Sequence, residues 1–221
     1  MYKFKVIFVV NDIEEKNIFM VCRVLNKEAL SLLPEGYYIR NCRKNELDIW
    51  MKFPFDNPHE AQQYREFMES FFQDVYASKE DLFFKKCLFV CNKKDTPVGT
   101  CMSWPAYGEI TTIHWFKVLK EYEGRGIGRA LLSQVMQRIS KNKYPVYLHT
   151  HPTCLRAIKL YSDFGFKLLT NPVIGTRENH VEEVLPFLEE NMPQKDYKNL
   201  KTTEASEDFL SVVNLSNRIE F

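Results

Sequence analysis

The sequence lacks long hydrophobic runs, clustered cysteines and a strong excess of charge of either sign. Its apolar runs are short, such as Val6–Val10, whereas a helix that crosses a bilayer needs roughly 20 apolar residues. Asn11 and Asp12 end that run at once, which leaves it too short for a secretory signal. We therefore expect a cytoplasmic protein that does not associate with membranes.

The six cysteines are dispersed, and no two of them have the spacing of a metal-binding pair. The closest two, Cys87 and Cys91, lie within one stretch that reads as a strand. Zinc sites need clustered ligands, and disulfide scaffolds are typical of small secreted chains. We therefore expect free thiols and no bound metal.

The formal net charge is only +1, which argues against a nucleic-acid-binding protein. The charge is uneven, because residues 177–221 contain five basic and ten acidic residues. The preceding part of the chain is consequently basic, which suits a core that receives an anionic small ligand. We expect the acidic end to be a solvated tail, and attraction of a cationic amine substrate is the alternative.

With 45% hydrophobic and 14% aromatic residues, the chain can bury a core without disulfides. We expect three parts, namely an N-terminal extension (1–36) packed on the core, a main domain (37–171), and a C-terminal helix and tail (172–221). In the extension, the alternation of apolar residues with lysines from Tyr2 to Phe8 predicts a strand. The apolar run 18–25 predicts its hairpin partner, and a short helix follows.

From residue 37 onward, hydrophobic periodicity predicts both strands and helices. The predicted strands are 37–42, 87–91, 98–104, 110–119, 145–150 and 166–169, and the predicted helices are 45–52, 58–76, 127–139, 154–164 and 181–190. Turn residues between the strands of 87–119 indicate an antiparallel meander. The helix over 58–76 carries a broad apolar stripe, which we expect to face the core.

A glycine-rich turn, with Gly124, Gly126 and Gly128, connects the strand 110–119 to an amphipathic helix. Glycine lets the backbone approach a ligand closely, and the unpaired amides at a helix start all point one way with partial positive charge. The arrangement predicts an anion nest for phosphate. Arg125 and Arg129 are candidates for direct phosphate contacts.

Two other phosphate-binding motifs do not fit this turn. A P-loop needs Lys and then Ser or Thr after its last glycine, but Arg129 and Ala130 follow Gly128. A dinucleotide fingerprint begins like Gly124 and Gly126, yet Arg129 occupies the position of its final glycine, and no parallel βαβ unit surrounds it.

The stretch 118–132 resembles the acetyl-coenzyme-A-binding motif of the GCN5-related N-acetyltransferase (GNAT) family. That motif is Arg or Gln, two residues, Gly, one residue, and Gly or Ala, with a strand valine some five positions before it. Val118, Gly126 and Gly128 match the motif, while Glu123 stands where the family has Arg or Gln.

A second segment lies at the right distance downstream. Arg156 to Phe166 resembles the family's Asn-x-x-Ala-x-x-Leu-Tyr-x-x-x-Gly-Phe segment, with Cys154 at the asparagine position. Both motifs occur in the family's order, and the resemblance covers about 37–171.

The resemblance implies an α+β, GNAT-like three-layer fold, in which a central, mostly antiparallel twisted sheet has a splayed strand pair and helices on both faces. It implies acetyl-coenzyme A as co-substrate, with its acetyl-carrying arm between the splayed strands. The residues that it assigns to the cofactor are the strand end Phe116, Lys117 and Val118, the turn residues Gly124, Arg125, Gly126, Ile127, Gly128 and Arg129, and Cys154 as a minor contact.

The resemblance also implies direct attack of an amine on the thioester in a ternary complex, which needs a base and a proton donor. Tyr161 is the family's usual donor to the leaving sulfur, and a phenol with a pKa of about 10 stays protonated at neutral pH. The family's strand glutamate falls at Thr112, which cannot act as a base. His114, on the same strand face, is the candidate base, with Glu109 or water as the alternative.

The acceptor remains open among polyamines, antibiotics, amino acids and protein amino groups, because the family varies this pocket and keeps the cofactor site. Trp104, Trp115 and Tyr107 are candidates for its wall, with core packing as the alternative. His149 and His151 either line the substrate mouth or are merely solvated.

A function of another class is also open, namely an acyl-coenzyme-A-binding regulatory or structural module without turnover. Glu123, Cys154 and the missing strand glutamate favour it. The terminal extensions either cover the acceptor side or form a homodimer.

Overall fold

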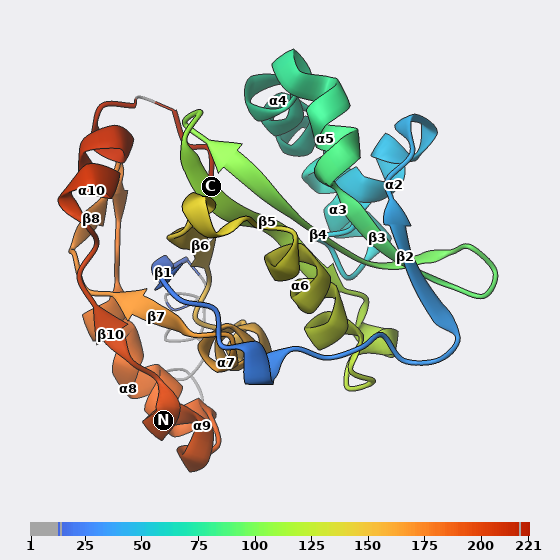
Figure 1. The fold of residues 1–221 in the computed structure, drawn as a ribbon. Coiled ribbons are helices and arrows are strands. Elements are labelled where there is room, and N and C mark those ends of the chain that lie inside the picture. The colour runs from blue at the N-terminus through green and yellow to red at the C-terminus, as the bar shows by residue number, and fades with distance from the viewer. Residues whose placement is uncertain (1–12, 14, 217) are drawn as a thin grey trace, which may run out of the picture. The chain divides into compact units, whose positions relative to one another are not determined.

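The computed structural model describes residue 13, residues 15–216 and residues 218–221 (Figure 1). The chain divides into two compact units. The first unit comprises the described residues up to 28 together with 105–112 and 141–221, and the second comprises 29–104 and 113–140. Strands β4 (Pro97–Ala106) and β5 (Ile110–Val118) contribute residues to both units.

The second unit contains the predicted meander. β2 (Tyr37–Asn41) pairs antiparallel with β3 (Leu88–Asn92), and β3 pairs antiparallel with β4, with β5 next in order. The helices of this unit are η2 (Lys44–Glu46), α2 (Leu47–Lys52), α3 (Pro58–Gln63), α4 (Arg65–Val75), η3 (Ala77–Lys79), α5 (Glu80–Lys86), η4 (Lys120–Tyr122) and α6 (Ile127–Gln137).

The helix predicted over 58–76 is two helices, α3 and α4. Tyr64, with φ −95° and ψ 11°, ends the first helix and precedes the second, so one periodicity does not run through both. Tyr64 and Phe67 are 46% and 55% exposed, so the prediction that the whole stripe faces the core is wrong at these two positions. Tyr64 stacks on Phe55 instead, with ring centroids 5.3 Å apart.

Trp50 of α2 is the centre of an aromatic core in the second unit. Its ring makes edge contacts with Phe72, Tyr76, Phe83 and Trp115 at centroid distances of 6.2, 5.7, 4.9 and 5.6 Å. Each such pair adds about 0.5–1.5 kcal/mol beyond the burial of area. Phe83 comes from α5, which the sequence patterns did not predict.

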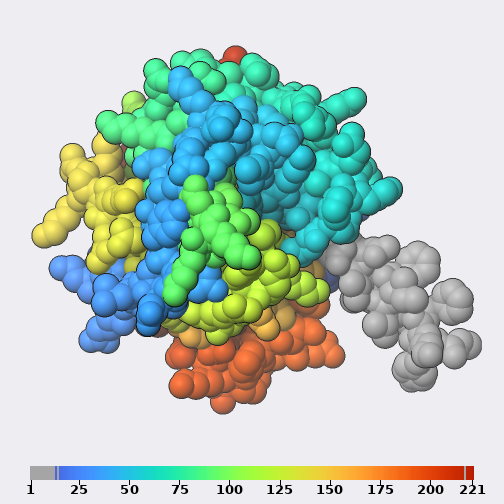
Figure 2. Space-filling view, turned by 90° about the vertical axis from the view of Figure 1, so that its right-hand side faces the viewer, coloured from blue at the N-terminus to red at the C-terminus, as the bar shows by residue number. Residues whose placement is uncertain are grey.

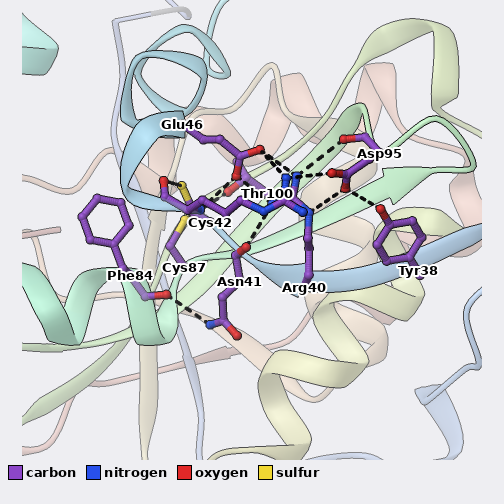
Figure 3. Close-up of polar contacts among 10 residues, drawn as sticks. Tyr38, Arg40, Asn41, Cys42, Glu46, Phe84, Cys87, Asp95 and Thr100 are labelled. Carbon is purple, nitrogen blue, oxygen red and sulfur yellow. Dashed lines mark hydrogen bonds and ion pairs between the residues drawn. The ribbon is translucent and has the colours of Figure 1, made fainter.

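An ion-pair network ties β2 to the turn between β3 and β4, the green segment beside the blue strand in Figure 2. Arg40 donates to both carboxylate oxygens of Glu46 at 2.7 Å and to Asp95 Oδ1 at 2.8 Å (Figure 3). The Arg40 hydrogen bond holds the pKa of Glu46 below its usual range. Hydrogen bonds from Tyr38, Arg40 and Arg43 likewise lower the pKa of Asp95.

The first unit is built on β1 (Ile18–Cys22), whose residues are all buried. β1 pairs antiparallel with β6 (Val146–Thr150) on one edge and with β7 (Phe166–Leu169) on the other. β10 (Thr202–Thr203) adds parallel to β7, and β5 pairs parallel with β6 at Thr111 and Thr112. The helices with residues in this unit are η1 (Lys27–Ala29), η5 (Lys141–Lys143), α7 (Leu155–Asp163), α8 (Val181–Asn191), α9 (Gln194–Asn199) and α10 (Glu207–Asn214).

The strand predicted between Tyr2 and Phe8 lies outside the described residues. Its predicted hairpin partner, the run 18–25, contains β1, and both edges of β1 are paired with β6 and β7.

The acidic C-terminal segment is folded, so the expectation of a solvated tail is wrong. It contains β9 (Arg177–Glu178), which pairs with β8 (Val173–Ile174), and it also contains β10 and the helices α8, α9 and α10. Phe209 of α10 stacks on Tyr147 of β6 with ring centroids 3.8 Å apart. Apolar residues at helical spacing offset the acidic composition here, because they have a core to bury against.

The predicted α+β class, with a mixed and mostly antiparallel sheet that is not closed into a barrel, is confirmed. Among the described residues, no helix combines the length and the apolar character that a membrane span needs.

Candidate active site

The glycine-rich turn has the backbone conformation of an anion nest. Gly124 and Gly126 have φ of +74° and +80°, the left-handed region that residues with a side chain rarely adopt. Gly126 is the N-cap of α6, and the first hydrogen bond of the helix runs from Ala130 N to Gly126 O at 3.1 Å. The amides of Ile127 and Gly128 precede that bond, at the positive end of the helix dipole.

Gly128 has a different structural role from the two glycines before it. A Cβ atom there would lie 3.2 Å from Phe116 Cζ and 3.5 Å from Val118 Cγ2, so α6 packs closely on β5 at this point. At Gly124 a Cβ would meet nothing within 4 Å. The open side of the turn is therefore at Gly124, while Gly128 fixes the helix against the strand.

Residues 29–34 lie along the turn and the start of α6. Arg129 Nη1 donates to Ala29 O at 3.2 Å, and Ser31 N donates to Ser133 Oγ at 3.0 Å. Pro34 Cγ lies 3.6 Å from the position of a Cβ on Gly126. In Figure 2 the yellow-green turn is at the surface beside this blue segment. The sequence patterns did not predict this neighbour.

The other predicted phosphate contact, Arg125, is also hydrogen-bonded to the protein. Its guanidinium donates to Glu121 O at 2.8 Å and to the Tyr37 hydroxyl at 3.4 Å, and it lies 5.2 Å from the centre of the Tyr122 ring. A guanidinium has five N–H donors, so these bonds leave donors for a phosphate.

The predicted strand-end residues Phe116, Lys117 and Val118 are half-buried at the end of β5. Lys117 pairs with Asp56 at 2.7 Å. The edge that faces β4 is occupied, because Leu119 N donates to Val98 O at 2.9 Å.

His114 is 4% exposed and shares a polar cluster with two aromatic residues. Its Nδ1 lies 2.6 Å from the Tyr76 hydroxyl, which also accepts the indole N–H of Trp115 at 3.0 Å. Tyr76 was predicted only as part of the apolar stripe, and its hydroxyl is the polar group that sequence reasoning missed.

Trp115 has φ +52° inside β5, which for a bulky residue costs on the order of 1–3 kcal/mol. Its neighbours hold it there, because the ring packs edge-on against Trp50 and Phe71 at 5.6 and 5.3 Å. The left-handed residue interrupts the strand alternation directly after His114.

The remaining predicted residues belong to the first unit. Tyr161 lies on α7, is 5% exposed, and has its ring 5.7 Å from that of Phe166. Cys154 is the exposed N-cap residue of α7, and its backbone N–H donates to His151 O at 3.0 Å. The second unit thus brings the turn, the strand end and His114 together, while Tyr161 and Cys154 lie in the first.

The alternative base, Glu109, is exposed in the first unit and lines a cavity of about 410 Å³. Tyr147, Phe209 and Asp208 line the same cavity. Thr112, at the family's glutamate position, is fully buried.

All six cysteines are free thiols, as predicted, and five of them are buried. Burial and a hydrogen bond with Cys42 raise the pKa of Cys87 well above its usual value. Buried neutral thiols of this kind behave as small apolar residues.

Known proteins include relatives of this chain. The sequence matches the acetyltransferase (GNAT) family over residues 46–166, which is more than half of the chain. It is 28% identical over 160 residues to an uncharacterized N-acetyltransferase of Methanocaldococcus jannaschii, covering 67% of this chain and 68% of that protein.

Solved structures include a GCN5-related N-acetyltransferase from Sphaerobacter thermophilus, at 19% identity and a TM-score of 0.48, covering 75% of this chain and 53% of that one. A GCN5-related N-acetyltransferase-like protein from Streptococcus suis is similar at 13% identity and a TM-score of 0.47, covering 73% and 63%. The chain thus spans about half to two thirds of the length of these two structures. The match of the family over 46–166 includes both the turn at Gly124–Gly128 and the segment around Tyr161, and the chain belongs to the acetyltransferase (GNAT) family.

Proposed function

We propose that the protein transfers an acetyl group from acetyl-coenzyme A to an amine. The observation that carries the proposal is the left-handed pair Gly124 and Gly126 at the start of α6. A helix start with this backbone is suited to a diphosphate, and the GNAT family normally uses acetyl-coenzyme A.

In this proposal the amides of Ile127 and Gly128 hold the pyrophosphate, and Arg125 and Arg129 turn a remaining N–H toward it. The acetyl-carrying arm lies along the end of β5 on the edge away from β4, since the β4 edge is already hydrogen-bonded. Backbone groups of residues 116–118 then bind the arm as a strand would.

The reaction needs a group that removes a proton from the attacking amine. The indole N–H of Trp115 can only donate, so the Tyr76 oxygen accepts it. We infer that the second lone pair of this oxygen accepts from His114 Nδ1–H, which makes Nε2 the acceptor nitrogen of the neutral imidazole. Neutral His114 then takes the amine proton at Nε2, directly or through water.

The leaving thiolate needs a proton donor, and we assign this role to Tyr161. The amine nitrogen forms the bond to the carbonyl carbon, the carbon–sulfur bond breaks, and the Tyr161 hydroxyl gives its proton to the sulfur. Solvent then reprotonates the phenolate.

Binding is tested by the thermal shift that acetyl-coenzyme A causes in wild type, Gly126→Glu and Gly108→Glu. Gly108 is a matched control, because it also has φ +80° and a Cβ there would meet nothing within 4 Å. We expect Gly126→Glu to lose at least 100-fold in affinity and Gly108→Glu to bind like wild type. Equal affinity in the two variants would refute the binding site.

Turnover is tested by the release of free coenzyme A thiol with a panel of amines. Release with at least one amine supports the transferase. Saturable binding without release by any amine would instead favour a regulatory acyl-coenzyme-A-binding module. This is the second candidate function, because Glu123 and Cys154 differ from the residues that the family motifs have at these positions.

A further inference from the structure

Arg177, in the short strand β9 of the first unit, has its guanidinium over aromatic rings. Its Cζ lies 4.7 Å from the centre of the Phe19 ring and 5.9 Å from that of Phe221. The two phenyl rings meet edge-on at 6.2 Å, and Tyr107 packs against Phe221 at 6.0 Å. The side chain is only partly exposed.

No carboxylate among the described residues lies within 4.0 Å of this guanidinium. The Glu220 carboxylate accepts the backbone N–H of Tyr107 at 2.7 Å through its Oε2. A charge that is largely removed from water without an opposite charge is costly, so structural arginines of this kind are normally paired.

The groups around Arg177 do not neutralise it. Burial lowers the pKa of Arg177 to about 10, so the guanidinium is still protonated at neutral pH. Burial, and then the charges of Arg177 and His151, hold the pKa of His149 well below its usual range. His149 is therefore neutral, and its Nε2 lies 2.8 Å from Asn17 Oδ1.

We propose that Arg177 binds a carboxylate on a small-molecule ligand, with the rings of Phe19 and Phe221 as the apolar floor under the guanidinium. The planar fork of one guanidinium matches the two oxygens of one carboxylate. A doubly charged phosphate is less suited, because neutral His149 supplies no second positive charge.

The carboxylate has two sources. It belongs either to the amine that accepts the acetyl group, which rests on the proposed function, or to a separate organic acid that binds the first unit. Arg177 would recognise the carboxylate in the same way in both cases. The first arm of the experiment therefore tests whether Arg177 binds a carboxylate, and the second tests which molecule carries that carboxylate.

The first arm needs no acetyl transfer. Benzoate is titrated into the ¹⁵N-labelled full chain, and benzamide is the neutral isostere. The NMR signal of the Arg177 Nε–H group is followed, and it is assigned by its absence from the spectrum of Arg177→Gln. We expect a saturable shift with benzoate, none with benzamide, and at least tenfold weaker binding in Arg177→Lys, which keeps the charge and loses the fork. Arg23→Gln, an exposed arginine of the same unit, is the control and should bind benzoate like wild type.

The proposal is overturned if benzoate gives no saturable shift, if benzamide gives the same shift, or if Arg23→Gln loses binding as fully as the Arg177 variants. If Arg177→Gln does not fold, Arg177→Lys identifies the signal and the wild-type titration still decides.

The second arm compares thiol release with phenylalanine and phenylalaninamide as acceptors. A KM at least tenfold higher for the amide in wild type, and equal KM values in Arg177→Lys, support the site and place the carboxylate on the acceptor. Equal KM values in wild type, with benzoate still bound, support a site for a separate acid. Absence of any release disproves the transferase alone, because the benzoate titration is independent of it.

Discussion

The glycine-rich turn and the His114 cluster are both parts of the second unit, yet the first is formed by backbone groups and the second by side chains. The turn consists of backbone, and its geometry depends on local residues, Gly124 and Gly126, within three positions. The cluster consists of side chains, and the hydroxyl that contacts His114 comes from Tyr76, 38 residues earlier. A backbone site depends on the helix that follows it, whereas a side-chain site depends on the whole aromatic core around it.

The most severe test of this difference is Trp50→Ala. Trp50 is buried and supports both Tyr76 and Trp115, so we expect a loss of about 3–5 kcal/mol in the free energy of unfolding. The affinity of the folded fraction for acetyl-coenzyme A should change less than threefold. Urea unfolding and calorimetric titration measure the two quantities, and Phe67→Ala, at an exposed position, is the control that should stay within about 0.5 kcal/mol.

Gly128→Val tests the close packing of α6 on β5 beside the turn. The new side chain would meet Phe116 and Val118, so we expect a loss of about 1–3 kcal/mol in stability. Gly124→Ala should cost only about 1 kcal/mol, because only its left-handed φ opposes the substitution. Equal losses in the two variants would mean that helix–strand packing is not what Gly128 provides.

Tyr76→Phe removes one oxygen and leaves the ring in place. The indole N–H of Trp115 and Nδ1 of His114 lose their shared partner, and we expect a loss of about 1–3 kcal/mol. The acidic limb of the pH–rate profile should also move, because the bond that fixes the His114 tautomer is gone. Tyr38→Phe, which removes the hydroxyl contact of an exposed tyrosine with Asp95, should leave the pH–rate profile unchanged. An unmoved profile in Tyr76→Phe would show that His114 is not the base.

The smallest expected effect concerns a region that belongs to neither site. Glu46 and Asp95 have pKa values below their usual range, through Arg40 for Glu46 and through Tyr38 and then Arg40 for Asp95. In the unfolded chain these carboxyl groups titrate at about pH 4. The stability that they contribute is therefore complete above that pH and is lost as the pH falls through their lower folded pKa values.

In Arg40→Met the free energy of unfolding should consequently fall less steeply below about pH 4 than in wild type. The affinity for acetyl-coenzyme A should not change. Urea midpoints at a series of pH values from 7 to 3 measure the slope, with Lys44→Met as the exposed control. A slope as steep as that of wild type would contradict the assignment.

Sequence patterns predicted the elements whose structure depends on residues close together in the chain. The strand, the turn and the helix from 110 to 137 could be predicted because hydrophobic periodicity and glycine spacing act within a few residues. Likewise, the apolar line from Ile127 along α6 is buried as its spacing requires.

Contacts between distant segments could not be predicted in this way. No periodicity indicates that Pro34 lies beside Gly126, that Tyr76 shares its hydroxyl with His114, or that Arg177 lies over Phe19. The break at Tyr64 was missed for a related reason, since the apolar residues of α3 and α4 share a spacing that does not reveal where the helix changes direction.

The two-residue strand β10 has a consequence for any shortened form of the protein. Leu168 N donates to Lys201 O at 2.8 Å and Thr170 N donates to Thr203 O at 3.1 Å, so this segment caps the outer hydrogen-bonding groups of β7. A fragment that stops at Asn199 would present those groups to solvent, and unprotected strands of this kind recruit one another. Self-association of such fragments, growing with concentration, is the behaviour to expect when the chain is shortened to a point between β7 and β10.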